Sequence, residues 1–123
     1  MRLSNEEFDA VIQDAIEELP EQFLEHLDEV LIDVMDLPDR DMLHEVRVGK
    51  HGLLGLYRGV PLPERSVDRA IELPARIILF KKNIERVCRG RDEMIEQIRI
   101  TLLHEIGHHF GFDEEDLEEL GYG

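Results

Sequence analysis

The fold is decided by the stretch T-L-L-H-E-I-G-H-H-F-G-F-D-E, residues 101–114, which contains the pattern H-E-x-x-H. In a helix, residues four apart lie about 40° apart around the axis, so His104 and His108 project side by side. Two imidazole nitrogens placed in this way suit one zinc ion, and Glu105 lies within reach of a water bound to that ion. We therefore predict a zinc site held by His104 and His108, with Glu105 as the catalytic general base.

A third metal ligand is expected after the helix. Gly111 allows the backbone to leave the helix through a conformation that a side chain would oppose. Such a turn brings the acidic residues that follow back towards the metal, and the spacing favours Glu114 as the third ligand. Asp113 and Asp116 remain open as alternatives, because an acidic run is also an ordinary helix start, where carboxylates meet the positive end of the helix dipole.

The residues before and within the motif have the period of an amphipathic helix, which we expect to run from Glu93 to Phe110 with Asp92 as its cap. Its apolar stripe consists of Ile95, Ile98, Leu102, Ile106 and Phe110. His104 and His108 fall on the opposite side of this stripe. His109 points towards the apolar side, so we expect a packed or hydrogen-bonded histidine there instead of a metal ligand.

At these residues the sequence resembles a family of small bacterial zincin-like metallopeptidases, which carry H-E-x-x-H-x-x-G followed by an acidic residue. The resemblance extends to residues 53–62 and 73–80, and so covers most of the chain. It implies a minimal zincin-like α+β domain that hydrolyses peptide bonds. The chain departs from larger metzincins in two ways: Glu114 stands where those enzymes have His, and no Met follows the motif. We therefore expect modest catalytic activity.

Length and composition bound the remaining possibilities. A chain of 123 residues is the size of one domain, so residues 1–123 are expected to form a single zincin-like metallopeptidase domain. The lone Cys88 excludes an internal disulfide, and residues 1–7 lack the apolar core of a signal peptide. No apolar run reaches membrane length. These features predict a cytoplasmic protein with no membrane partner.

The net charge of -15 is distributed unevenly along the chain. Residues 1–45 carry 2 basic and 15 acidic side chains, residues 46–100 carry 12 and 7, and residues 101–123 carry 0 and 7. The ordinary consequence is that the segments attract one another and keep the domain soluble. The functional consequence is an acidic surface, which favours basic peptide or protein substrates and repels nucleic acid.

The rest of the chain predicts a small mixed sheet packed on an N-terminal helix and the H-E-x-x-H helix. Ser4 and Glu7 make a capping box for an amphipathic helix that continues to Leu19. A short helix is expected over residues 21–27, strands over residues 30–35 and 76–81, short strands within residues 49–63, and a helix capped by Asn83. The strand over residues 76–81 is either an edge strand that pairs with substrate or a buried central strand.

The resulting hypothesis is a zinc metallopeptidase in which Glu105 takes a proton from water and returns it to the leaving amine. Tyr57 and Tyr122 are suggested as donors to the oxyanion on their chemistry alone. The alternative is a catalytically weak or inactive metal-binding interaction module. A metal-dependent endoribonuclease of ribosomal RNA maturation fits poorly, because such enzymes have a third His after the pair and no Glu beside the first.

Overall fold

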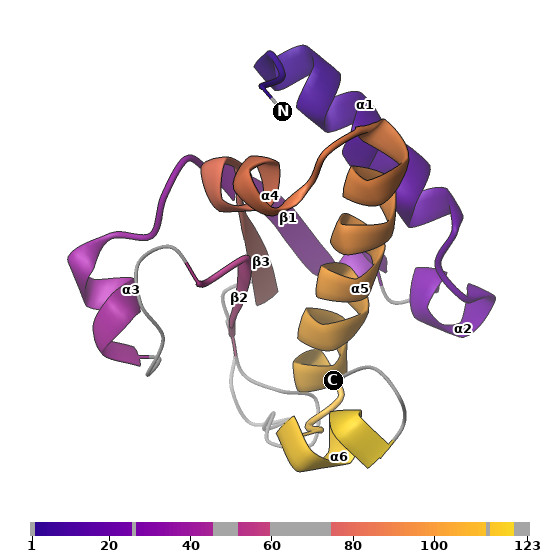
Figure 1. Cartoon of the computed structure of the whole chain (residues 1–123). Coiled ribbons are helices and arrows are strands. Elements are labelled where there is room, and N and C mark those ends of the chain that lie inside the picture. The colour runs from indigo at the N-terminus through magenta and orange to yellow at the C-terminus, as the bar shows by residue number, and fades with distance from the viewer. Residues whose placement is uncertain (1, 26, 46–51, 60–74, 113, 120–123) are drawn as a thin grey trace.

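The computed structural model describes residues 2–25, 27–45, 52–59, 75–112 and 114–119. Within this part of the chain, three strands form one mixed sheet in the order β1-β3-β2 (Figure 1). Strand β1 (Val30–Met35) runs parallel to β3 (Ala75–Phe80), and β2 (Gly55–Arg58) runs antiparallel to it. The sheet is mixed and the helices pack against it, so the predicted α+β fold, with a small mixed sheet packed on the N-terminal helix and the motif helix, is confirmed.

Helices surround this sheet (Figure 1). The long helix α5 crosses one face of the sheet with α1 packed alongside it, and α3 lies at the other face. No helix in the described ranges is both long enough and apolar enough to cross a membrane. The helical segments are α1 (Asn5–Glu17), α2 (Glu21–Leu24), the 3-10 turn η1 (Leu27–Glu29), α3 (Arg40–Glu45), α4 (Lys81–Val87), α5 (Arg91–His109) and α6 (Glu114–Glu119).

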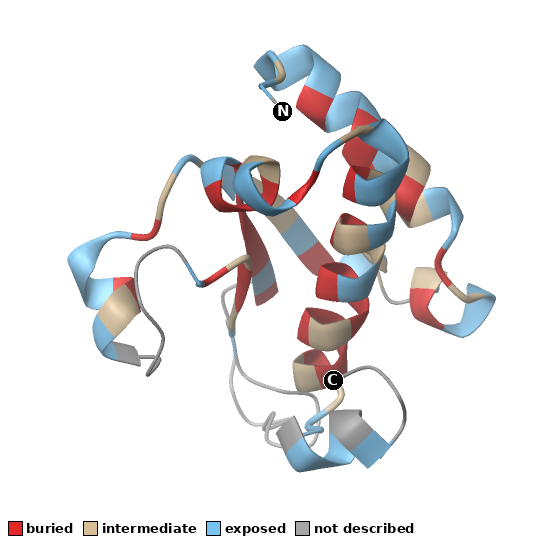
Figure 2. Ribbon diagram, viewed as in Figure 1, coloured by how far each residue is buried: buried red, intermediate tan, exposed pale blue. Residues whose placement is uncertain are grey.

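The two faces of β3 pack into different clusters, because successive side chains of a strand point to opposite faces. Ile77 and Leu79 belong to the main core, which they share with α1 and α5. Ile78 and Phe80 belong to a smaller cluster with Met42 of α3. Figure 2 shows buried residues where α1, α5 and the sheet meet. This burial of apolar surface holds α5 in a fixed place on the sheet.

Helix α1 begins as the sequence predicts. The Ser4 hydroxyl accepts a hydrogen bond from the Glu7 backbone N–H at 3.1 Å, and the Glu7 carboxylate accepts one from the Ser4 N–H at 2.9 Å. These two bonds complete the predicted capping box. The bond from the Ser4 N–H, followed by the influence of the Ser4 hydroxyl, lowers the pKa of Glu7 below its usual value of 4.5, because hydrogen bonding favours the ionised carboxylate.

Two predicted helix caps are wrong. Helix α4 begins at Lys81, so Asn83 lies inside the helix, where its buried amide donates to the Leu53 carbonyl at 2.8 Å. The Asn83 side chain, which we predicted to cap the helix, thus forms a tertiary hydrogen bond instead. Helix α5 begins at Arg91 after Gly90, and Asp92 therefore lies in its first turn, where a carboxylate still faces the positive end of the dipole.

The structure decides between the two interpretations of the strand over residues 76–81. It is β3, which pairs with β1 on one side and β2 on the other, and is therefore central among the described strands. Five of its six residues are buried. Among these three strands, β2 is the edge strand that lies beside the motif helix. The sequence predicted it only as one of several short strands in a glycine-rich segment.

Candidate metal centre

Helix α5 brings His104, Glu105 and His108 together on one face. Their ligand atoms all lie within 4.8 Å of one another. The two imidazole rings meet edge to face, with centroids 5.1 Å apart. This geometry is the direct result of the four-residue spacing on a helix with 3.6 residues per turn. Within the described residues the sequence-predicted pair of histidines therefore converges, with Glu105 beside it.

The two histidines are more exposed to solvent than Glu105. His104 and His108 are half-buried, while Glu105 is only 8% exposed. The predicted apolar stripe faces the core on the other side of the helix, with Ile98, Leu102 and Ile106 buried. The helix is thus fixed by its apolar side, and its histidines remain open to a ligand from solvent.

A backbone carbonyl fixes the ring of His108. Nδ1 of His108 lies 3.0 Å from the carbonyl oxygen of Phe112. A carbonyl oxygen only accepts, so Nδ1 carries the proton and donates to it. The neutral ring then has its lone pair on Nε2, the form in which imidazole binds a metal.

The same turn ends helix α5. Gly111 has a positive φ of 89°, which L side chains rarely adopt. The Phe112 N–H donates to the Gly107 carbonyl at 3.0 Å, and the Gly111 N–H donates to the His108 carbonyl at 2.9 Å. These are the two bonds of a Schellman motif. The motif ends the helix and also places the Phe112 carbonyl against His108.

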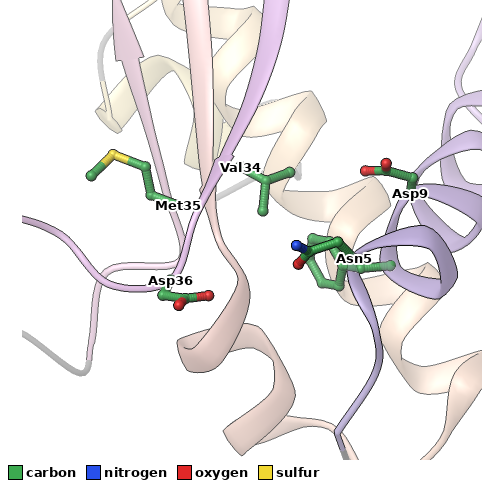
Figure 3. Close-up of a pocket in the computed structure, with 6 residues that line it drawn as sticks. Asn5, Asp9, Val34, Met35 and Asp36 are labelled. Carbon is green, nitrogen blue, oxygen red and sulfur yellow. The ribbon is translucent and has the colours of Figure 1, made fainter.

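These residues fit a zinc ion. Two converging imidazole nitrogens are donors that zinc prefers, and His108 has its tautomer set for binding. The Glu105 carboxylate lies beside them, where it can contact a water bound to the ion. A separate hollow of about 400 Å³ lies between α1 and the end of β1. Figure 3 shows Asp9 and Asp36 on opposite sides of it. None of the three motif residues lines that hollow, so it is not part of the metal centre.

Of the three candidates for the third ligand, the structure describes the side chain of Asp116 alone. Glu114 is the first residue of α6, but its side chain and the whole of Asp113 lie outside the described part of the chain. Asp116 is described as exposed, and it is not one of the three residues that converge. Glu114 therefore remains a prediction from spacing.

His109 has a structural role, as the sequence predicts. It is fully buried, with Nε2 3.0 Å from the Glu29 carboxylate and Nδ1 2.8 Å from the Tyr57 hydroxyl. The hydroxyl that was suggested as an oxyanion donor thus contacts His109, and Tyr122 lies outside the described residues. No sequence pattern pointed to Glu29, which is 80 residues away from His109 along the chain.

Strand β2 packs against helix α5. Gly55 of this strand is buried, and a Cβ built on it would meet the Thr101 and Glu105 side chains. A glycine inside a strand is a sign of close backbone approach, so Gly55 is the sequence signal for this contact.

The fold and the site together define a class of protein. A sheet-backed helix that presents H-E-x-x-H with its histidines converging and its glutamate between them is the arrangement of zinc metallopeptidases of the zincin type. A family model described as zincin-like metallopeptidase matches residues 27–123. The chain belongs to the zincin-like metallopeptidase family. No individual curated protein matches the chain significantly.

Proposed function

We propose that the protein is a zinc-dependent metallopeptidase in which His104, His108 and Glu114 hold the ion and Glu105 is the general base. The observation that carries this proposal is the convergence of the His104, Glu105 and His108 side chains on one face of α5. Membership of the zincin-like family supports the same assignment. Glu114 enters by its spacing after Gly111.

Zinc bound at such a site supplies a Lewis acid, which polarises the scissile carbonyl and makes water acidic near neutral pH. Glu105 accepts the proton of the attacking water and delivers it to the nitrogen of the leaving amine. The proximity of the Glu105 carboxylate to the two imidazoles supports this role. The Phe112 carbonyl keeps the His108 ring in its binding orientation throughout.

Modest activity is part of the proposal. Two histidines and one carboxylate bring the site closer to electrical neutrality than three histidines would, so the ion polarises a carbonyl less strongly. The substrate is a peptide or protein, and basic segments are favoured by the net charge of -15 and by the 7 acidic residues among the last 23. The same charge disfavours nucleic acid.

The decisive experiment combines metal analysis with digestion of a peptide library. Wild type and Glu105→Gln are purified, their zinc content is measured, and each is incubated with the library. Both proteins are expected to contain zinc, with cleavage by Glu105→Gln reduced about 100-fold or more, because a general base contributes roughly 10²- to 10⁴-fold. Glu93→Gln is the matched control, since Glu93 is an exposed glutamate at the other end of the same helix.

Zinc content and cleavage by the two proteins together distinguish three outcomes. Equal cleavage by wild type and Glu105→Gln would refute the catalytic role of Glu105. Zinc in both proteins with no cleavage by either would refute the peptidase and favour a metal-binding interaction module. Protein without zinc would contradict the site itself.

A further inference from the structure

Strand β2 approaches α5 most closely at Gly55. A Cβ built on Gly55 would lie 2.6 Å from Cγ2 of Thr101, a separation that real Cβ atoms essentially never show. It would also lie 3.5 Å from Cγ of Glu105, which is ordinary contact. Any side chain at this position must therefore move the strand, Thr101 or the helix.

Thr101 has little freedom to move aside. Its hydroxyl donates to the Gln97 carbonyl at 2.8 Å, and the residue is 7% exposed. A threonine in a helix has few allowed χ1 rotamers, and this hydrogen bond selects one of them, which fixes where Cγ2 points. Rotation of Cγ2 away from Gly55 would break the hydrogen bond.

The strand is also held from its other side. Gly55 is paired with Leu79 of the central strand, and the Leu54 carbonyl accepts a hydrogen bond from the Phe80 N–H at 3.0 Å. Tyr57 lies two residues after Gly55, on the same face of the strand. Its hydroxyl is hydrogen-bonded to Nδ1 of His109 at 2.8 Å. A strain at Gly55 is therefore transmitted to the stretch of α5 around Thr101 and Glu105.

We propose that Gly55 and Thr101 are positioning residues that set the spacing between β2 and α5, and thereby the position of the Glu105 carboxylate. Glu105 follows Thr101 by four residues, so both side chains face the strand. A Cβ at Gly55 would come into van der Waals contact with Cγ of Glu105, so glycine at this position leaves that space to the Glu105 side chain. This inference rests on the proposed function, because it assigns the placement of the proposed base.

The test is a cycle of Gly55→Ala, Thr101→Ser and the double variant. Serine keeps the hydroxyl that bonds to Gln97 and removes the methyl group that a Cβ at position 55 would meet. Gly55→Ala is expected to lower kcat about 10- to 100-fold, since a misplacement of about 1 Å can cost 10²-fold. Zinc affinity is expected to stay within about threefold, because both histidines lie on the helix itself. The double variant is expected to recover kcat to within about threefold of wild type.

Gly90→Ala is the matched control, because no atom lies within 4 Å of a Cβ at Gly90. Its kcat is expected to equal that of wild type. Unchanged kcat in Gly55→Ala would overturn the proposal, and so would a double variant as impaired as Gly55→Ala. If Gly55→Ala does not fold, the double variant decides: a folded, active protein supports the proposal and an unfolded or inactive one overturns it.

Failure of the proposed function can be told apart from failure of this inference. A wild-type protein that cleaves no peptide would refute the peptidase. The contact between Gly55 and Thr101 is then tested by the thermal unfolding temperatures of the zinc-free variants. Recovery of the Gly55→Ala unfolding temperature by Thr101→Ser supports the contact, and absence of recovery overturns it.

Discussion

The hydroxyl of Tyr57 lies 2.8 Å from Nδ1 of His109, whose Nε2 lies 3.0 Å from the Glu29 carboxylate. An ionised carboxylate only accepts, so Nε2 carries a proton, and in the neutral ring Nδ1 accepts from Tyr57. The buried ring therefore joins the segment before β1, the end of α5 and strand β2. His109, the residue after His108, thus attaches helix α5 to strand β2.

We predict that Tyr57→Phe lowers the free energy of unfolding by about 1 kcal/mol, because the buried Nδ1 of His109 loses its hydrogen-bond partner. Urea unfolding of the zinc-free protein measures this change. Unchanged stability would contradict the fastening role. A fall in kcat of about 100-fold with unchanged stability would instead show that Tyr57 stabilises the oxyanion.

We predict that Gly111→Ala weakens both the fold and the metal site. The φ of 89° at Gly111 opposes a side chain, at a cost of about 1 kcal/mol of stability. A shift of the turn would move the Phe112 carbonyl from His108, so zinc affinity should fall about 10-fold. Competition with a chelator of known affinity measures the second effect. Gly90→Ala, at an extended position, should leave zinc affinity unchanged.

The identity of the third ligand can be decided with three amide substitutions. Glu114→Gln should weaken zinc binding by more than the roughly 10- to 100-fold that loss of an outer-shell partner costs. Asp113→Asn and Asp116→Asn should have little effect, and they serve as controls of equal charge. If one of these two gives the largest loss in a zinc titration, that aspartate is the ligand instead.

The capping box should make stability depend on pH. The folded-state pKa of Glu7 is lowered, so its contribution is present above about pH 4.5 and is lost as the pH falls through the folded-state value. The difference in unfolding free energy between wild type and Glu7→Gln should therefore be largest near pH 7 and shrink in acid. Glu6→Gln removes a charge from the same turn without touching the capping box. An equal pH dependence in both variants would contradict this assignment.

Much of the fold could be predicted where the signal is local. Helix α1 with its capping box and strand β1 agree with the sequence prediction, because their periodicity and end signals lie within a few residues. The caps assigned to Asn83 and Asp92 were wrong. A side chain that suits a cap also suits a tertiary hydrogen bond, and Asn83 bonds to Leu53, 30 residues away.

By itself, the sequence determined the helix that carries the H-E-x-x-H motif and the pairing of His104 with His108, because residues four apart on a helix must share a face. Only the tertiary structure decided which strand borders that helix. It also decided that Gly55 rests against Thr101 and that His109 is held by Tyr57 and Glu29. The physical reason is that these contacts join distant segments, whose meeting depends on how the whole core packs.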